Sequence, residues 1–258
     1  MPEVKQSCAV RIQGLSYNYP AAGRALEDVS LSVDVGEVVG LVGPSGAGKS
    51  TLLMHLNGLL PENIPKQIID ADSAAVRILG HAVCKVNLPE IRQLVGFLFQ
   101  DPDDQLFCST VREDVAFGPL NQGLSRDDVM ERVTTSLRAV DLEDFADRNT
   151  LQLSVGERKR VCLAGVFACR PSVLALDEPF GNLDPRARRS VIRIIESFQG
   201  CQIIATHDLN LVAEVCPRVV ILDQGCVQAD GRTDEILSDR ILVERHGLEV
   251  PIQYRAGC

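Results

Sequence analysis

Apolar runs of strand length alternate with helix-like segments along most of the chain. Residues 10–19 and 25–35 have the pattern of β-strands near the start. Later apolar runs predict buried strands at residues 37–42, 94–99, 173–176, 202–206 and 218–222. Because helical segments separate the last three runs, the pattern predicts a parallel sheet with crossover helices.

The middle of the sequence has a mainly helical pattern. Four apolar residues recur there at helical spacing: Val129, Val133, Leu137 and Val140. Ser125 and Asp128 give a capping signal at the start of that helix, and a second helix is expected over residues 154–170. We therefore expect a helical subdomain at about 101–170, inserted between two halves of the sheet, and a short helical tail at 233–258.

Composition narrows the class of protein. The 258 residues are 45% hydrophobic, which allows a sizeable core, and the net charge of −9 argues against nucleic acid as a partner. The start has no signal-peptide pattern and no 18 apolar residues run together, so the chain is not expected to span a membrane by itself. Nine cysteines without a CxxC pair favour free thiols in a reducing cytosol over disulfides or a zinc site.

A glycine-rich turn follows the strand at 37–42 and precedes a helix expected over 49–58. It consists of Gly43, Pro44, Ser45, Gly46, Ala47, Gly48, Lys49 and Ser50, with Thr51 next. In this P-loop pattern backbone N–H groups surround phosphate oxygens, the lysine supplies a charge to the β- and γ-phosphates, and the serine hydroxyl ligates Mg²⁺. The start of the following helix also favours an anion. The turn therefore predicts a nucleotide-phosphate site.

Two acids, Asp177 and Glu178, follow the apolar run at 173–176. Ligands of parallel sheets bind beyond the carboxyl ends of the strands, so these acids are expected beside the P-loop. Asp177 would hold Mg²⁺, directly or through water, and Glu178 would accept a proton from an attacking water. For an isolated Asp-Glu pair, a solvated strand end would be an equally good interpretation, but the P-loop favours the catalytic one.

Three further side chains have candidate roles beside plainer alternatives. His207 follows an apolar run and either reaches the γ-phosphate or is an ordinary surface or core histidine. Gln100 ends another run, and its amide oxygen is a candidate Mg²⁺ ligand. Tyr17 and Tyr19 are expected on one face of the first strand. One interpretation is that Tyr19 stacks on adenine through its ring face, and the other is that either ring packs in a core.

Further motifs make the set resemble the ATP-binding-cassette (ABC) family. Leu153, Ser154, Val155, Gly156 and Glu157 resemble the ABC signature, usually LSGGQ. Residues 180–185 follow the Asp-Glu pair as the ABC D-loop does, and Gln100 and His207 match the Q-loop and switch histidine. The resemblance covers about residues 10–232. It implies an ABC ATPase domain over 1–232 of the α/β class, with a P-loop NTPase parallel-sheet core, an N-terminal antiparallel β subdomain and an inserted α-helical subdomain.

The resemblance also implies ATP and Mg²⁺ as cofactors and assigns roles to residues. The phosphates would be bound within residues 43–51, and Tyr19 would stack on adenine. Mg²⁺ would be held by Ser50, Gln100 and Asp177. Glu178 would be the catalytic base and His207 the γ-phosphate contact. Two cassettes of this family pair head to tail, so Ser154 and Gly156 would touch the ATP of a second ABC ATPase subunit, identical or related to this chain.

The signature departs from the family pattern at Val155. A β-branched residue replaces a glycine there, which would hinder closure of that half-site if the position required a positive φ. Ser154 and Glu157 nevertheless form a capping-box pattern that begins a helix and aims its N–H groups outward.

The segment after Gln100 resembles one branch of the family, the ATPases of energy-coupling-factor importers. Residues 95–107 read VGFLFQDPDDQLF and residues 110–119 read TVREDVAFGP. Such importers take up cobalt, nickel or vitamins through a transmembrane scaffold and a substrate-binding membrane protein. The resemblance implies a subunit held at the cytoplasmic face of the membrane by these partners. The alternative is that the segment only packs the helical subdomain.

The alternative functions are those of other ABC ATPases. An ATPase of another ABC transporter type would share the same motifs. A soluble ABC ATPase of DNA maintenance would carry a long coiled-coil insertion, and no heptad stretch occurs here. A ribosome-associated factor would have two cassettes, whereas one P-loop is present. The transported substrate is not encoded in these motifs.

Overall fold

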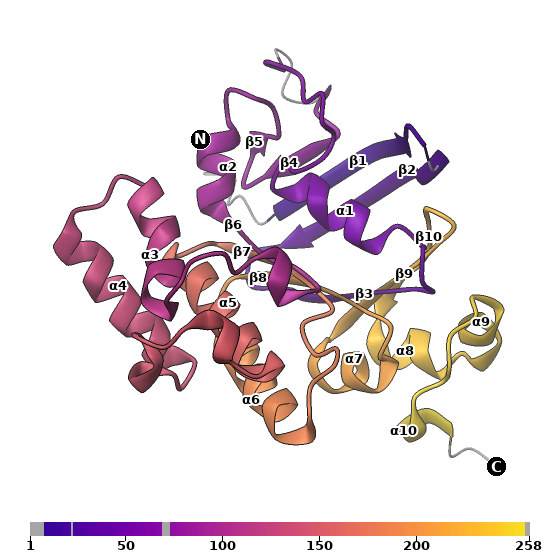
Figure 1. Cartoon of the computed structure of the whole chain (residues 1–258). Helices are drawn as coiled ribbons and strands as arrows, with labels where there is room; N and C mark the ends of the chain where they lie inside the picture. The colour runs from indigo at the N-terminus through magenta and orange to yellow at the C-terminus, as the bar shows by residue number, and fades with distance from the viewer. Residues whose placement is uncertain (1–7, 22, 69–72, 256–258) are drawn as a thin grey trace, which may run out of the picture.

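The computed structural model describes residues 8–21, 23–68 and 73–255, which form two sheets with helices around them (Figure 1). One sheet is antiparallel, with the order β2-β1-β4-β5. Its strands are β1 (Cys8–Tyr19), β2 (Gly23–Asp34), β4 (Val76–Ile78) and β5 (His81–Ala82). The predicted N-terminal antiparallel β structure is confirmed, although β4 and β5 were not expected.

The second sheet has the order β10-β9-β3-β8-β7-β6. Its strands are β3 (Val38–Val42), β6 (Val95–Leu98), β7 (Val173–Asp177), β8 (Cys201–Thr206), β9 (Arg218–Asp223) and β10 (Cys226–Arg232). All neighbouring strands are parallel except β9 and β10, which form a hairpin. The predicted parallel core is therefore confirmed, with β10 as an unexpected antiparallel edge.

The strand predicted at 94–99 starts one residue too early. Leu94 ends helix α2 (Leu88–Leu94), which has a proline in its first turn. The backbone becomes extended at Val95, with φ −107° and ψ 110°, so β6 begins there.

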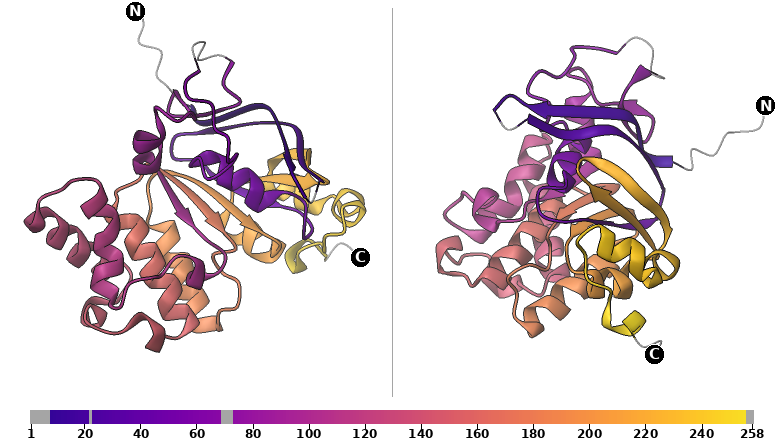
Figure 2. Two further views of the ribbon diagram at one scale, coloured as in Figure 1. Left: turned by 45° about the horizontal axis from the view of Figure 1, so that its top comes forward. Right: turned by 90° about the vertical axis from the view of Figure 1, so that its right-hand side faces the viewer.

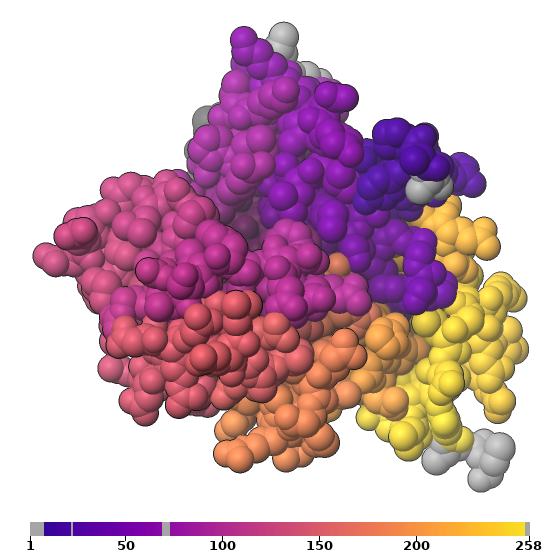
Figure 3. Space-filling model, viewed as in Figure 1, coloured from indigo at the N-terminus to yellow at the C-terminus, as the bar shows by residue number. Residues whose placement is uncertain are grey.

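Three helices make up the predicted helical region: α3 (Val111–Asn121), α4 (Arg126–Ala139) and α5 (Val155–Ala168). They pack on one another and lie together on one side of the molecule (Figures 1 and 3). Ser125 caps α4 as predicted, because its hydroxyl accepts a hydrogen bond from Asp128 N at 3.2 Å. Helix α5 stops at Ala168, two residues before the expected end, and Arg170 has a positive φ of 53°.

The remaining helices cover the sheet or follow it. They are α1 (Lys49–Leu56), α6 (Pro185–Glu196), α7 (Leu209–Val215), α8 (Thr233–Ser238), α9 (Arg240–Arg245) and α10 (Ile252–Arg255). Short 3₁₀ turns occur at Pro102–Asp104, Glu143–Phe145 and Thr150–Gln152. Helices α8–α10 lie on the side away from α3 and α4 (Figure 2). The limits of the ATPase domain and tail stay a prediction.

Side chains of the central strands enter two separate hydrophobic clusters. Val39 and Leu41 of β3 face α1 and the antiparallel sheet, where they meet Leu52. Leu174 and Leu176 of β7 face the opposite side, among residues of α5 and α6. Burial on both faces explains why these strands read as almost continuous apolar runs.

Among the described residues, no helix is long and apolar enough to cross a bilayer. Their eight cysteines are unbridged, and no group of three or more His, Cys, Asp or Glu side chains among them could hold a metal ion.

Candidate functional site

The site lies where three neighbouring parallel strands end. In β3, β8 and β7, Val42 is in register with Thr206, and Ala205 with Asp177. Residues that directly follow these strand ends are therefore side by side, although they are far apart in the sequence. The P-loop, the Asp-Glu pair and His207 meet in this way.

The P-loop needs glycine at positions where the backbone passes close to other backbone. A Cβ on Gly43 would lie 1.9 Å from Leu222 O, and one on Gly48 would lie 2.5 Å from Ala25 O. Gly48 also has φ 103° and is the N-cap of α1, with no side-chain cap. The first N–H groups of α1 are thus left for an anion.

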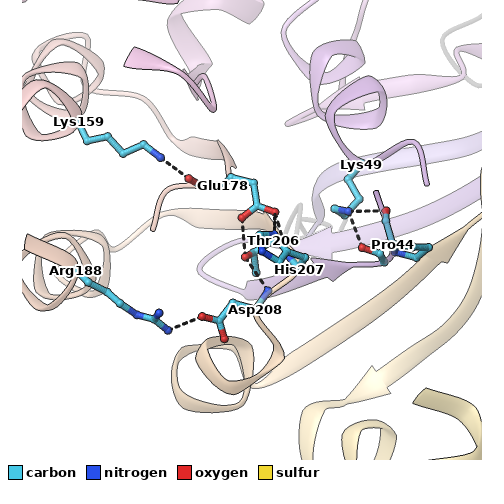
Figure 4. A network of polar contacts seen from close by, with 9 residues as sticks. Pro44, Lys49, Lys159, Glu178, Arg188, Thr206, His207 and Asp208 are labelled. Carbon is cyan, nitrogen blue, oxygen red and sulfur yellow. Dashed lines mark hydrogen bonds and ion pairs between the residues drawn. The ribbon is translucent and has the colours of Figure 1, made fainter. Parts of the chain in front are cut away.

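The ammonium group of Lys49 lies inside this loop. Its Nζ donates to Gly43 O at 2.6 Å and to Pro44 O at 3.0 Å (Figure 4). Burial lowers the pKa of Lys49, while the charges of Glu178 and Asp177 oppose that shift. The lysine therefore lies among the acids that the sequence placed beside the P-loop.

A cavity joins the P-loop to the first sheet. It is lined by Tyr19, Gly23, Arg24, Ala25, Gly46, Ala47, Gly48, Lys49, Ser50 and Thr51. Tyr19 is half-buried, and its hydroxyl lies 3.3 Å from Thr51 Oγ1. Tyr17 is buried at 9% exposure and packs edge-on against Tyr19, with ring centroids 4.9 Å apart. Of the two tyrosines, Tyr19 is the one beside the phosphate loop.

Asp177 and Ser50 form the core of the candidate metal site. Asp177 is 4% exposed, and burial raises the pKa of its carboxyl, against the lowering effects of a hydrogen bond with Ser50 and of the Lys49 charge. A hydroxyl and a carboxylate are the oxygen donors that Mg²⁺ prefers. The residues present therefore fit this ion.

The Glu178 carboxylate is held by the last residue of β8 and by the residue that follows it. Its Oε2 accepts from Thr206 Oγ1 at 3.0 Å, and its Oε1 accepts from His207 N at 3.0 Å (Figure 4). The Nδ1 atom of His207 is 2.6 Å from the same Oε1. The His207 side chain is 70% exposed, which excludes the core-histidine alternative.

A second cavity lies in front of Glu178. Its lining consists of Gln100, Lys159, Glu178, Phe180, Gly181, Asn182, Leu183, Arg188, Thr206, His207 and Asp208. Gln100 thus shares a cavity with Glu178 and His207, whereas Ser50 lines the P-loop cavity and Gln100 does not. The structure brings the predicted base, histidine and glutamine together.

The signature lies apart from these two cavities. Ser154 and Gly156 line a third cavity with Asp184, the N-cap of α6, and with residues of α6 that include Arg186. Gly156 is required by packing, because a Cβ there would lie 2.7 Å from Ala187 Cβ. Within one chain, the signature and P-loop therefore do not share a cavity.

The signature helix begins as its capping-box pattern predicts. Ser154 Oγ accepts from Glu157 N at 3.3 Å, and Glu157 Oε2 accepts from Ser154 N at 2.8 Å. Val155 is the first helical residue, is not among the residues with positive φ, and is 38% exposed. The conformational difficulty expected at Val155 does not arise in this structure.

Two charged contacts at the site were missed from the sequence. Lys159 of α5 is buried and donates to Glu178 O, and Arg188 of α6 pairs with Asp208 at 2.7 Å (Figure 4). The sequence around Lys159 does not distinguish it from a lysine on the solvent-exposed face of a helix. The Asp208 side chain had a readable signal, since it caps α7 by accepting from Leu211 N.

A strand, P-loop and helix beside an Asp-Glu strand end define a P-loop ATPase. Residues 26–181 match the family described as ABC transporter, and the chain belongs to that family and is an ATP-binding ATPase.

The chain is 42% identical to the energy-coupling factor transporter ATP-binding protein EcfA of Methanothermobacter thermautotrophicus, over 94% of this chain and 76% of that protein. Its fold is similar to CbiO1 of Clostridium perfringens, part of the CbiONQ transporter complex, with a TM-score of 0.77, 30% identity and coverage of 96% and 98%. The cassette MJ0796, solved as a dimer with ADP and Pi, has a TM-score of 0.73 and 25% identity, with coverage of 87% and 98%.

Proposed function

We propose that this protein is the ATPase subunit of an energy-coupling-factor importer, held at the cytoplasmic face of the membrane by its partners. Its likeness to EcfA and to CbiO1, part of a transporter complex, supports this branch of the family. A soluble ABC ATPase of DNA maintenance would carry a long coiled coil. The longest helices among the described residues have 14 residues, which is too short for such a coiled coil.

The observation that carries the proposal is an exposed aromatic pair in the segment after Gln100. Phe107 is 65% exposed and Phe117 is 47% exposed, with ring centroids 4.7 Å apart in an edge-on contact. They line a cavity of about 210 Å³ between β6, α3 and α5. Exposed aromatic clusters are typical of interaction sites, because such rings gain most when a partner excludes water from them.

The backbone around this pair is fixed. Phe107 N and Cys108 N both donate to Asp114, at 3.2 and 3.3 Å to Oδ1. Gln105 accepts from Phe99 N at 3.2 Å and so ties the same loop to the end of β6. A preformed apolar groove of this kind fits an apolar helix from a transmembrane scaffold.

Within the ATP site, we assign the roles that the chemistry of each group allows. Lys49 and the P-loop N–H groups bind the β- and γ-phosphates, and Tyr19 stacks on adenine. Ser50, Asp177 and Gln100 hold Mg²⁺, which supplies charge neutralisation at the phosphates. Glu178 accepts the proton of the attacking water, and His207 contacts the γ-phosphate.

The complete site requires a second ABC subunit. Ser154 and Gly156 lie in a separate cavity from the P-loop of their own chain, as expected for groups that act on a neighbour's ATP. The dimeric state of MJ0796 supports the pairing. The second cassette is a copy of this chain or a related one.

Co-purification from detergent-solubilised membranes tests the proposal. Tagged wild type is expected to retain polytopic membrane proteins, identified by mass spectrometry. The double variant Phe107→Asp with Phe117→Asp is expected to lose them while binding ATP normally, because two charges cannot enter an apolar interface without cost. Ile241→Asp is the matched control, since Ile241 is 73% exposed on α9, away from this groove. Retention by the double variant would contradict docking at this surface.

A further inference from the structure

Lys159 is a buried cation inside the catalytic region. It is 2% exposed and lies on α5, five residues after the signature serine Ser154. Its Nζ donates to the main-chain oxygen of Glu178 (Figure 4). None of the ion pairs found among the described residues includes Lys159, so a backbone carbonyl is its direct partner. A buried lysine that serves only to pack is rarely found, because burial disfavours its charge.

The backbone of Glu178 has a conformation that needs support. Its φ is 44°, in the left-handed region that costs a non-glycine residue roughly 1–2 kcal/mol. Glu178 N donates to Ala205 O at 2.9 Å, and Glu178 O accepts from Gly181 N at 3.2 Å as well as from Lys159. These three contacts hold the peptide groups on both sides of the residue.

That backbone conformation determines where the carboxylate lies. The Glu178 side chain is 12% exposed, and with this main-chain geometry it contacts Thr206 and His207. A change in φ would swing the carboxylate away from both partners and from the cavity it faces. Displacement of a catalytic group by about 1 Å is enough to reduce turnover by two orders of magnitude.

Nearby acidic residues compensate the positive charge of Lys159. Burial lowers the pKa of its ammonium, while the charges of Glu178 and Asp177 oppose this shift. An opposite charge close by favours the charged form of a buried lysine. Lys159 is therefore compensated by the catalytic acids rather than by a dedicated carboxylate.

We propose that Lys159 is a positioning residue that fixes the left-handed backbone of Glu178 and thereby aims the catalytic carboxylate. Because Ser154 is the N-cap of α5 and Lys159 lies within that helix, the same contact links the signature of a chain to that chain's own base. Five residues of helix place the two about 7.5 Å apart along the axis. The inference rests on the proposed role of Glu178 as the base.

The test is steady-state ATP hydrolysis by Lys159→Met and Lys159→Arg, with thermal unfolding measured in parallel. Lys159→Met is expected to lower kcat at least tenfold with KM for ATP within twofold. Its Tm is expected to fall, because removing one buried charge leaves the nearby acids without their compensating cation, so kcat is measured well below the Tm of the variant. Lys159→Arg keeps a charged donor and is expected to recover part of kcat.

Arg132→Met is the matched control. Arg132 is a half-buried cation in the same helical region that donates to Ala168 O at 3.1 Å and to Gln122 Oε1 at 3.0 Å, away from Glu178. Its kcat is expected to stay within twofold of wild type. An equal loss in Arg132→Met would show that any buried cation here matters, and would overturn the assignment.

A Glu178→Gln background separates this inference from the role of Glu178. If Lys159 acts through Glu178, adding Lys159→Met to Glu178→Gln causes no further loss, because groups that act as a unit are not additive. Normal turnover by Glu178→Gln would refute the base itself. An inactive Glu178→Gln together with a fully active Lys159→Met would overturn only the positioning role. If Lys159→Met fails to fold, Lys159→Gln and Lys159→Arg replace it. Loss of kcat in both, although both keep a donor, would also overturn it.

Discussion

Gly48 offers the sharpest test of the P-loop geometry. An added Cβ would lie 2.5 Å from Ala25 O and 2.9 Å from Leu26 Cδ2, and the residue has φ 103°. Gly48→Ala therefore combines backbone strain of roughly 1–2 kcal/mol with a contact that a rigid carbonyl cannot relieve. Relief requires the loop to move away from β2, which turns the N–H groups of the first helical turn away from the phosphates.

A second glycine allows the backbone strain of an alanine to be measured without a steric clash. Gly123 also has a positive φ, 76°, but a Cβ there has nothing within 4 Å. Gly123→Ala is expected to lower Tm by roughly 2–8 °C, since 1 kcal/mol corresponds to about 2–4 °C for a chain of this size. Its affinity for ATP is expected to be that of wild type, because the residue lies between α3 and α4.

Gly48→Ala should lower Tm at least as much and weaken ATP binding tenfold or more. Equilibrium binding of a fluorescent ATP analogue and thermal unfolding measure the two effects separately. If Gly48→Ala binds ATP as wild type does while its Tm falls, the close approach to Ala25 is not what shapes the phosphate site, and the reasoning fails.

Two further predictions concern the chemistry at the phosphates. Lys49→Ala is expected to abolish ATP hydrolysis, because the β- and γ-phosphates lose the cation that lies within the loop; residual turnover near the wild-type rate would contradict this role. Glu178→Gln is expected to bind ATP with unchanged affinity and to lower kcat by roughly 10²–10⁴-fold, the usual contribution of a general base. Binding and single-turnover assays distinguish the two variants, and a normally active Glu178→Gln would remove Glu178 as the base.

Most of the fold could be predicted because the central strands are buried on both faces. Their apolar runs are visible without knowledge of their neighbours, and the P-loop and Asp-Glu pair mark two strand ends directly. The missed elements are those without such burial. Strand β10 has no buried residue and carries only polar and small residues beyond its start. Its one signal was the turn before it, where Gln224 and Gly225 both have positive φ.

The candidate site was predictable where motif order identifies residues, and not where packing alone decides. The sequence left Tyr17 and Tyr19 as alternatives, since both lie on one face of β1. Only the position of α1 shows that Tyr17 is buried and that Tyr19 lines the P-loop cavity. Lys159 was missed for the same reason, because its burial depends on how α5 packs against the loop after β7.

The central claim is that each ATP site is shared between the P-loop of one subunit and the signature of another. Activity of a mixture tests it, using Lys49→Ala with an intact signature and Ser154→Arg with an intact P-loop. Each variant alone should be inactive. In homodimers, random mixing gives half mixed dimers, and each of these has one site with no lesion and one with both.

ATPase activity is therefore expected to return to roughly a quarter of the wild-type rate if the two sites of a symmetric dimer act independently. The variants are mixed under conditions that allow subunit exchange, and hydrolysis is compared with each variant alone at the same total concentration. Recovered activity shows that an intact site forms across the interface. Full activity of Ser154→Arg by itself would contradict the account, because the signature would then have no part in the ATP site.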